Sequence, residues 1–193
     1  MEERPPGEPL GGPPFTAVLE SLAITHVVGL PDNTSASLFD ALESHPSIRL
    51  VTVTREGEAF AIASGLWLGG ASPMVVVQNT GLLESGDALR GTAMRMGVPL
   101  PIVVTGRGYR KLATAGLEPD EPLTRELLVR PDVDSAALLT ERTLAAWGVP
   151  CERADAELPG DLPGALRGAL RGSVERARAE VRPVALIATS PLE

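Results

Sequence analysis

At 193 residues, the chain is long enough for one domain of ordinary size with a hydrophobic core, and hardly long enough for two. Its formal net charge of -8, spread without a basic stripe, argues against a nucleic-acid partner. No apolar run approaches the roughly 20 residues of a membrane helix, and the first residues lack the features of a signal peptide, so we expect a cytoplasmic protein that does not contact a membrane.

The cysteine and histidine content limits metal and redox chemistry. Cys151 is the only cysteine, which excludes an internal disulfide and any CxxC motif. We expect it to pack as a small hydrophobic residue at the start of a strand. With His26 and His45 as the only histidines, and with no HExxH motif or carboxylate cluster, we expect no directly bound metal.

Along the chain, short aliphatic runs alternate with longer helical patterns. Residues 1–14 are rich in Pro and Gly and are expected to be disordered, and residues 15–193 are expected to form the domain. Most predicted strands are rich in Val and Ile without polar alternation, as in a parallel sheet buried on both faces. These strands are His26 to Leu30, Ile48 to Val53, Met74 to Gln78, Pro101 to Thr105, Cys151 to Ala154 and Val184 to Ala188.

Helical patterns separate these strands, and each is long enough to cross over a sheet. The predicted helices are Thr16 to Ile24, Ser35 to Ser44, Glu56 to Leu68, Gly86 to Met96, Ser135 to Trp147 and Ala165 to Val181. This order predicts an α/β fold, a single doubly wound domain with a six-stranded, mostly parallel sheet. Such sheets bind ligands beyond the carboxyl ends of their strands, so the informative loops follow Leu30, Val53, Gln78 and Thr105.

The first of these loops is Gly29-Leu30-Pro31-Asp32-Asn33-Thr34. Glycine and proline shape the turn, and Asp32, Asn33 or Thr34 can each cap the following helix. Helix capping alone explains these polar residues, so a capping role and a ligand-binding role both stay open.

The second loop leads into an Ala-rich helix that begins near Glu56. Glu56 and Glu58 in a first helical turn are favourable against the helix dipole, which is one sufficient explanation. A carboxylate at the end of a buried strand can also be desolvated and share a proton with a ligand nitrogen, which makes Glu56 a functional candidate. We expect Glu58 to face solvent. The small residues between Ala59 and Gly65 allow close packing against another helix or subunit.

The third and fourth loops also carry polar groups. Gln78-Asn79-Thr80-Gly81 offers amides and a hydroxyl, and Gly81 permits close approach of the backbone, although a plain strand-to-helix turn has the same composition. Gly106 to Thr124 is long for such a connection and is a candidate mobile loop or lid. Its cations, Arg107, Arg110 and Lys111, either are solvated or meet an anionic group of a substrate.

Taken in order, these segments resemble the pyrimidine-binding (PYR) domain of thiamine diphosphate enzymes, especially sulfopyruvate and phosphonopyruvate decarboxylases. The resemblance rests on a Gly-x-Pro-Asp turn, a glutamate before an Ala-rich helix that ends in Gly, a Gln-Asn-Ser/Thr-Gly turn, and a strand leading to a Gly-Arg-Gly-like loop. The matching segments are Gly29 to Asp32, Glu56 to Gly65, Gln78 to Gly81 and Pro101 to Gly108. The chain has Asp87-Ala88-Leu89 where the family tends to have Asn-x-Leu, which leaves the substrate open.

The resemblance implies a catalytic role for Glu56. In the family this carboxylate hydrogen-bonds the aminopyrimidine ring of the cofactor and promotes the tautomer that removes the thiazolium C2 proton. The reaction implied is decarboxylation of a small 2-oxo acid. Substrate contacts are implied for Asn79 and Arg107. The cofactor-binding residues implied are Gly29, Pro31, Asp32, Glu56, Gln78, Asn79, Thr80 and Gly81.

The resemblance also implies a partner. Family members hold the diphosphate through Mg²⁺ with a Gly-Asp-Gly motif in a second, PP domain, and these 193 residues contain no Gly-Asp-Gly. We therefore expect Mg²⁺ to be held by a separate PP-domain (beta) subunit, in an α₂β₂-like enzyme that is active only as a heteromer. Alternatives are a subunit of an acyloin-forming carboligase, a non-catalytic PYR-like regulatory domain, and an unrelated nucleotide or flavin module. The last alternative is weakened because no GxGxxG motif or P-loop follows the first strand.

Overall fold

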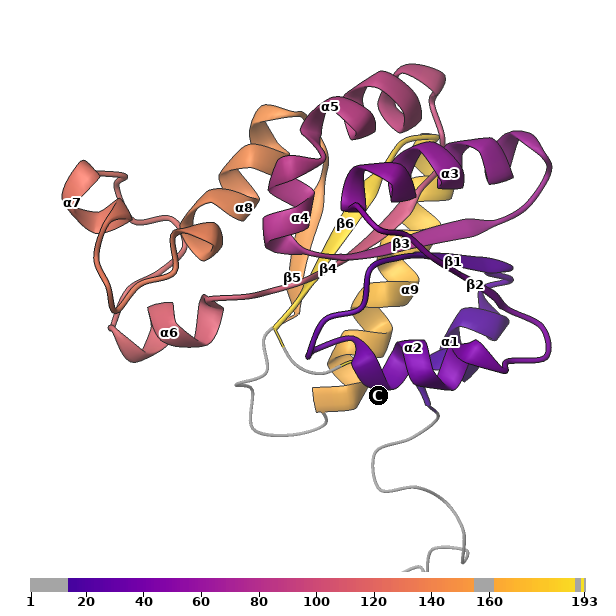
Figure 1. The fold of residues 1–193 in the computed structure, drawn as a ribbon, viewed down its shortest axis with the longest axis horizontal. Helices are drawn as coiled ribbons and strands as arrows, with labels where there is room; N and C mark the ends of the chain where they lie inside the picture. Colours follow the sequence, from indigo (N-terminus) through magenta and orange to yellow (C-terminus); the bar gives the residue numbers. More distant parts are fainter. Residues whose placement is uncertain (1–13, 155–161, 190–191, 193) are drawn as a thin grey trace, which may run out of the picture.

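The computed structural model describes residues 14–154, 162–189 and 192, and within them it contains a six-stranded sheet (Figure 1). The strands lie in the order β2-β1-β3-β4-β6-β5, and every neighbouring pair is parallel. The prediction of a six-stranded, mostly parallel α/β fold is confirmed, and the sheet is parallel throughout. The strands are β1 (His26–Gly29), β2 (Arg49–Thr52), β3 (Pro73–Gln78), β4 (Pro101–Thr105), β5 (Cys151–Ala154) and β6 (Val184–Ala188).

Helices cover both faces of this sheet (Figure 1). One face carries α3 (Glu56–Leu68), α4 (Asn79–Glu84), α5 (Gly86–Leu89), the π-helical segment η1 (Arg90–Met94) and α8 (Ser135–Ala146). The opposite face carries α1 (Phe15–Ser21), α2 (Ala36–Glu43) and α9 (Leu162–Glu180). The short helices α6 (Tyr109–Thr114) and α7 (Arg125–Leu128) lie beyond the carboxyl ends of the strands, at the left of Figure 1.

The central strands are aliphatic because both of their faces are covered. All residues of β4 and β6 are buried, and so are the first five residues of β3. Val75 and Val77 pack in the same cluster as Phe60 of α3, whereas Val76 packs on the other face with Phe39 of α2. Two apolar layers, one on each side of the sheet, therefore explain why these strands lack polar alternation.

The predicted strands agree with the structure to within one residue at each end, and the helix predicted from Gly86 begins there, as α5. The prediction missed α4, because it treated Gln78 to Gly81 as a turn, whereas α4 begins at Asn79. It also began the last helix at Ala165, three residues after the start of α9 at Leu162. Gly81 suggested a turn because glycine disfavours helix interiors. Gly81 has a packing role instead, because it leaves room for the side chain of Glu56.

The long segment from Gly106 to Thr124 is only partly irregular. It contains α6, which the sequence pattern did not predict because the helix is one short stretch between glycines. Farther along, Nη2 of Arg142 on α8 donates hydrogen bonds to the carbonyl oxygens of Pro119 and Glu121, at 3.3 and 2.5 Å. Helix α8 thus anchors the second half of this segment.

The N-terminal segment was predicted to be disordered over residues 1–14. Residues 1–13 lie outside the described residues, and Pro14 precedes the first turn of α1. In the part of the chain that the structure describes, no helix is both long enough and apolar enough to cross a membrane.

Candidate functional site

Four connections leave the sheet at its carboxyl edge, after β1, β2, β3 and β4. These strands are neighbours in the sheet, so the connections lie together. Gly29 ends β1 beside Val76 of β3, and a Cβ atom on Gly29 would overlap the carbonyl oxygen of Val76. The structure therefore places Gly29 in the packing between two strands, and Pro31 follows it at the surface.

Glu56 is the first residue of α3, and its partly buried side chain lies over the first turn of α4. A Cβ atom built on Gly81 would overlap Cγ, Cδ and Oε1 of Glu56, so only glycine leaves room for this carboxylate. Among the described residues, none forms a hydrogen bond or ion pair with the Glu56 carboxylate. Its oxygens are therefore available to a ligand.

Asp32 connects the ends of three strands. Its Oδ1 accepts hydrogen bonds from the backbone N–H groups of Thr34 and Ser35, at 2.9 and 2.8 Å, and from the Ser35 hydroxyl at 2.9 Å. Its Oδ2 accepts a hydrogen bond from Nε2 of Gln78 at 2.9 Å and another from the hydroxyl of Thr105. Oδ1 thus holds the turn before α2, whose N-cap is Ser35, while Oδ2 bonds to β3 and β4.

The same contacts set the protonation of Asp32. Burial raises the pKa of its carboxyl, but the hydrogen bonds, with that from Thr105 foremost, outweigh burial and bring the pKa below its ordinary value. Asp32 is ionised at neutral pH, and its oxygens are engaged within the chain.

Gln78 extends this network toward α4. Its Nε2 donates to Asp32, and its Oε1 accepts a hydrogen bond of 2.8 Å from the Thr80 hydroxyl. Both ends of the Gln78 amide are therefore engaged, while Thr80 lies at the surface. The structure brings Asp32, Gln78 and Thr80 into one hydrogen-bonded chain beside Glu56.

Asn79 points into the protein and has no exposed surface. Its Nδ2 donates to the carbonyl oxygen of Arg107 at 2.9 Å and to the Thr140 hydroxyl at 3.2 Å, and its Oδ1 accepts from the Arg107 backbone N–H at 3.2 Å. The amide thus holds the loop after β4 against the start of α4. Because Asn79 is fully buried, its role in the structure is to hold these two segments together.

Arg107 has a carboxylate partner of its own. Its Nε lies 2.9 Å from Oδ2 of Asp134, and its side chain remains 60% exposed. The neighbouring Gly108 has a φ of +91°, and a Cβ atom there would lie 2.6 Å from Cβ of Asp134. Glycine is therefore needed for the loop to pass Asp134, and an anionic ligand would have to share Arg107 with that carboxylate.

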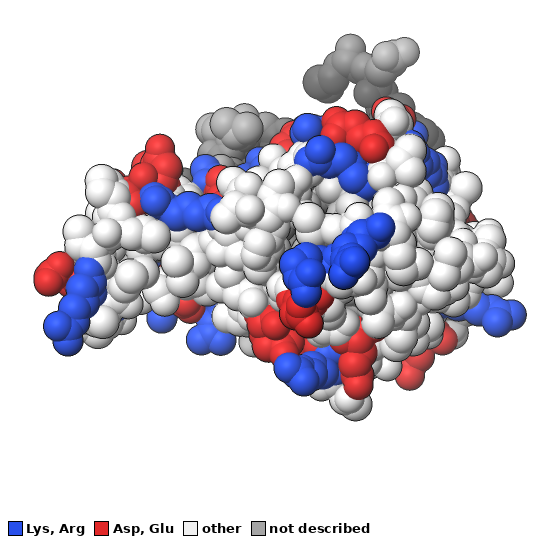
Figure 2. Space-filling model, turned by 90° about the horizontal axis from the view of Figure 1, so that it is seen from above, with Lys and Arg blue, Asp and Glu red and all other residues white. Residues whose placement is uncertain are grey.

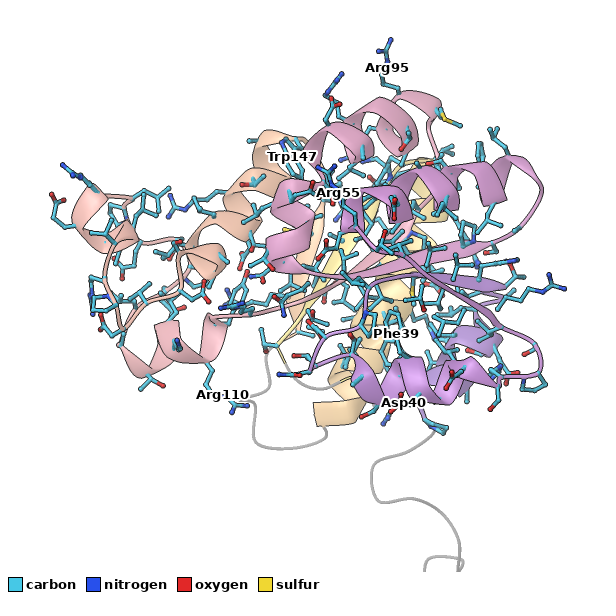
Figure 3. The ribbon with its side chains drawn as sticks, in the orientation of Figure 1. Phe39, Asp40, Arg55, Arg95, Arg110 and Trp147 are labelled. Atoms are coloured by element: carbon cyan, nitrogen blue, oxygen red, sulfur yellow. The ribbon has the colours of Figure 1, made fainter. Side chains whose placement is uncertain are left out.

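The other cations of this segment lie apart from the site. Arg110 and Lys111 are exposed residues of α6. Arg110 points outward, away from the sheet (Figure 3). The structure does not bring them together with Glu56.

The two glutamates of α3 have different positions. Glu58 is exposed, as expected, and its Oε2 accepts hydrogen bonds from the backbone N–H groups of Thr54 and Arg55, at 3.2 and 3.3 Å. Glu58 therefore stabilises the start of the helix. Arg55 also reaches Glu84 at the end of α4, with its Nε 2.6 Å from Oε1, and so connects the two helices on either side of Glu56.

Residues 11–123 match the family model of the thiamine pyrophosphate enzymes, described as the N-terminal TPP binding domain of those enzymes. The chain belongs to this family. The predicted relation to the PYR domain of thiamine diphosphate (thiamine pyrophosphate) enzymes is confirmed, and the match supports thiamine diphosphate as the cofactor.

Curated relatives within this family are decarboxylases. The chain is 35% identical to a phosphonopyruvate decarboxylase of Streptomyces viridochromogenes over 99 residues, which are 51% of the chain and 25% of that protein. It is 36% identical to a sulfopyruvate decarboxylase of Methanosarcina acetivorans over 98 residues, which are 51% of the chain and 23% of that protein. It is 27% identical to the sulfopyruvate decarboxylase subunit alpha of Methanococcus maripaludis over 114 residues, which are 59% of the chain and 68% of that subunit. The chain thus matches about a quarter of the length of the first two relatives.

A solved structure agrees with the fold of a thiamine diphosphate enzyme. The benzoylformate decarboxylase of Polynucleobacter necessarius superposes on 91% of this chain and 29% of its own, with a TM-score of 0.56 and 22% sequence identity. At this identity the likeness establishes the fold alone.

The residues at the carboxyl edge fit the pyrimidine half of thiamine diphosphate. The Glu56 carboxylate lacks a partner in the described part of the chain, and Gly81 leaves the space in which it lies. An acceptor of this kind suits a ring nitrogen that exchanges a proton.

Sequence reasoning missed several supporting residues of this thiamine diphosphate-binding domain. Thr105, Thr140, Ser35 and Asp134 hold Asp32, Asn79 or Arg107 in place. One signal was available for Thr105, because it is a polar residue at the carboxyl end of a strand that is otherwise aliphatic. Thr140 and Asp134 come from a helix distant in sequence and carried no such signal.

Proposed function

We propose that the chain is the PYR-domain (alpha) subunit of a two-subunit, thiamine diphosphate-dependent 2-oxo-acid decarboxylase of the sulfopyruvate and phosphonopyruvate type. The observation that carries the proposal is the Glu56 carboxylate over Gly81, without a partner among the described residues, at the carboxyl edge of a family-typical sheet. Glu56 is the catalytic residue in this proposal.

Glu56 acts on a proton. Its carboxylate hydrogen-bonds the pyrimidine nitrogen and keeps a proton at that atom during the reaction. When bound, thiamine diphosphate supplies the carbon nucleophile for the 2-keto carbon and accepts the electrons that carbon dioxide leaves behind. Two sets of contacts support this chemistry by fixing the first turn of α4, over which the carboxylate lies: the chain of Asp32, Gln78 and Thr80, and the hydrogen bonds of Asn79 to the Arg107 backbone.

A separate subunit holds the diphosphate and Mg²⁺ in this proposal. The 193 residues contain no Gly-Asp-Gly. Three relatives, from Methanococcus maripaludis, Methanothermobacter thermautotrophicus and Methanocaldococcus jannaschii, are themselves named as subunit alpha of sulfopyruvate decarboxylase. In this proposal the assembly is α₂β₂, with each cofactor bound between one chain of each kind.

The outer face of α3 offers a surface for that subunit. Ala61 and Gly65 lie four positions apart and therefore share one side of the helix. Ala61 and Gly65 are exposed, and a Cβ atom on Gly65 would meet nothing within 4 Å. Glycine inside a helix costs about 1 kcal/mol relative to alanine, so a role outside this chain explains it best. Figure 2 looks down on this side of the molecule, where uncharged surface surrounds small groups of charged residues.

Reconstitution tests the proposal. The chain is mixed with a candidate PP-domain subunit, Mg²⁺ and thiamine diphosphate, and aldehyde and acyloin are both followed with sulfopyruvate, phosphonopyruvate and pyruvate as substrates. Aldehyde formation is expected, whereas acyloin as the main product would support the carboligase alternative. Isothermal titration of the chain alone is expected to give weak cofactor binding. Tight, Mg²⁺-dependent binding by the chain alone would contradict the shared site.

Variants of the two glutamates separate catalysis from folding. Glu56→Gln is expected to reduce kcat by at least about 1,000-fold, because general acid-base steps contribute factors of this order. Glu58→Gln is the matched control, since glutamine still accepts the hydrogen bonds at the helix start. Glu56→Gln with wild-type turnover would exclude Glu56 as the catalytic residue. If the wild-type chain itself showed no activity after reconstitution, a non-catalytic role for the chain would be favoured.

A further inference from the structure

A recess lies on the face of the sheet opposite Glu56. It is a cavity of about 370 Å³ between α2 and the edge strand β2. Phe39 is buried on the side of α2 that faces the sheet, and Asp40 lies farther out on the same helix (Figure 3). The recess thus has an apolar floor and an acidic rim. Its lining residues are Pro31, Ala36, Phe39, Asp40, Glu43, Leu50 and Thr52.

The backbone beside this recess has free hydrogen-bonding groups. Strand β2 is at the edge of the sheet and, among the residues that the structure describes, pairs only with β1. The N–H groups of Arg49 and Val53 point to β1, where they bond to the carbonyl oxygens of Thr25 and Gly29. Because successive residues of a strand point their backbone groups to opposite sides, those of Leu50 and Thr52 point outward. The same two residues line the recess with their side chains.

The rim is negatively charged in a place where negative charge is unfavourable. Asp40 and Glu43 are exposed, and neither forms an ion pair or hydrogen bond with the described residues. They lie three positions apart on one side of α2, so their charges repel each other. Glu43 also ends the helix, where the helix dipole disfavours an anion. A cation bound at this rim would relieve both effects.

We infer that this recess binds an extended segment of another protein, which pairs with the free edge of β2 and places a Lys or Arg side chain between Asp40 and Glu43. The outward backbone groups favour a peptide over a small molecule, since an extended chain offers matching donors and acceptors at strand spacing. The rim selects the basic side chain, and Phe39 and Leu50 contact its methylene groups. This surface lies on the face of the sheet opposite α3, which carries Glu56.

Titration of the full chain with short peptides tests the inference by NMR. The probe is acetyl-Lys-Val-Lys-Val-Lys-amide, which presents lysines on one face of a strand. It is expected to shift the amide resonances of Leu50 and Thr52 and to bind at least about tenfold more tightly than the peptide with Glu in place of Lys. A version methylated at every backbone nitrogen is expected to lose binding, because it cannot donate hydrogen bonds to a strand edge.

Variants of the rim complete the test. Asp40→Asn with Glu43→Gln is expected to weaken the lysine peptide at least about fivefold, while the circular dichroism spectrum is unchanged. Glu118→Gln with Asp120→Asn is the matched control, since it removes two exposed acids from the segment after α6. Equal binding of the methylated peptide would mean that a small amphipathic cation is the occupant and would overturn the inference. No shift of Leu50 or Thr52 with millimolar lysine peptide would overturn it too.

Discussion

The side chain of Glu56 fills the space that a Cβ atom of Gly81 would occupy. The first residue of α3 and the third residue of α4 are thus fitted to each other, although 25 positions of sequence separate them. The carboxylate gains a fixed position without a hydrogen bond from the described residues. The contact leaves its oxygens free for chemistry.

Gly81→Ala is expected to displace the Glu56 carboxylate and to reduce kcat of the reconstituted enzyme by about 100-fold, because small misplacements of a reacting group have effects of this size. The free energy of unfolding should change by less than about 1 kcal/mol, since alanine favours the helix and offsets part of the strain. Gly172→Ala in α9 is the control, because a Cβ atom there meets nothing within 4 Å. Full activity in Gly81→Ala would show that the contact is unimportant.

Asp32→Asn is expected to lower the free energy of unfolding by about 1 to 3 kcal/mol at pH 7, because the hydrogen bonds to the ionised carboxylate weaken. The folded pKa of Asp32 lies below its ordinary value of 3.8. The wild type therefore keeps this stabilisation above the unfolded pKa and loses it as the pH falls through the folded pKa. Urea unfolding from pH 7 to pH 3 should show the two proteins converging at low pH. A difference that is independent of pH would mean that the charge of Asp32 is irrelevant.

Asn79→Ala is expected to lower the free energy of unfolding by about 2 to 4 kcal/mol. The backbone N–H and carbonyl of Arg107 lose their partner, and the cavity left behind is buried. Hydrogen exchange should become faster in residues 106–108 before it does elsewhere. Asn33→Ala is the control because Asn33 is an exposed amide of the same kind. Unchanged hydrogen exchange in residues 106–108 would show that Asn79 does not hold this loop in place.

Gly86→Ala is expected to strain the contact between α5 and α8, since the new Cβ atom would lie 2.5 Å from Cζ2 of Trp147. The free energy of unfolding should fall by about 1 to 3 kcal/mol, as in other overpacked cores. The fluorescence of Trp147, measured in a Trp67→Phe background, should change as the ring moves. Combining Gly86→Ala with Trp147→Leu should recover part of the lost free energy of unfolding. If the effects of the two substitutions on this free energy simply added, the two residues would not be in contact.

Arg107→Ala tests whether the substrate carries a second anionic group. The expected result is a KM for sulfopyruvate that rises about tenfold or more, because a charge-assisted contact is lost, while the KM for pyruvate stays within about twofold. Arg110→Ala is the matched control, since that side chain points away from the site (Figure 3). If Arg107→Ala changed the KM for sulfopyruvate no more than the KM for pyruvate, Arg107 would not contact a second anionic group of the substrate. Its role would then be the ion pair with Asp134.

Most of the sheet could be predicted from the sequence because β3, β4 and β6 are largely aliphatic runs, which is the usual composition of parallel strands buried on both faces. The edge strands β2 and β5 are partly exposed and carry charged residues. The order of the loops also indicated Glu56 correctly as a residue at the carboxyl edge. The helix start at Asn79 could not be predicted in this way. Local preference places Gly81 in a turn, whereas the structure keeps it in a helix because Glu56 needs its space.

The roles of the polar residues were harder to predict. Asp32, Gln78 and Asn79 are the residue types that bind ligands, and the sequence suggested that they do. In the structure their polar atoms bond mainly to Thr105, Thr80, Thr140 and the backbone of Arg107. These partners lie up to 73 positions away in sequence. No local pattern indicates such pairings, because they arise only when the strands assemble.

Three residues, Val53 to Arg55, separate the end of β2 from Glu56. Each residue of an α-helix turns the chain by about 100°. Inserting one residue into this connector would change no existing residue, yet an insertion taken up in the first turn of α3 would rotate the carboxylate away from Gly81 by about that angle. The reactivity of this site is therefore encoded in the length of a loop as well as in the residue that follows it, and chains that carry the same glutamate behind a longer or shorter connector need not share it.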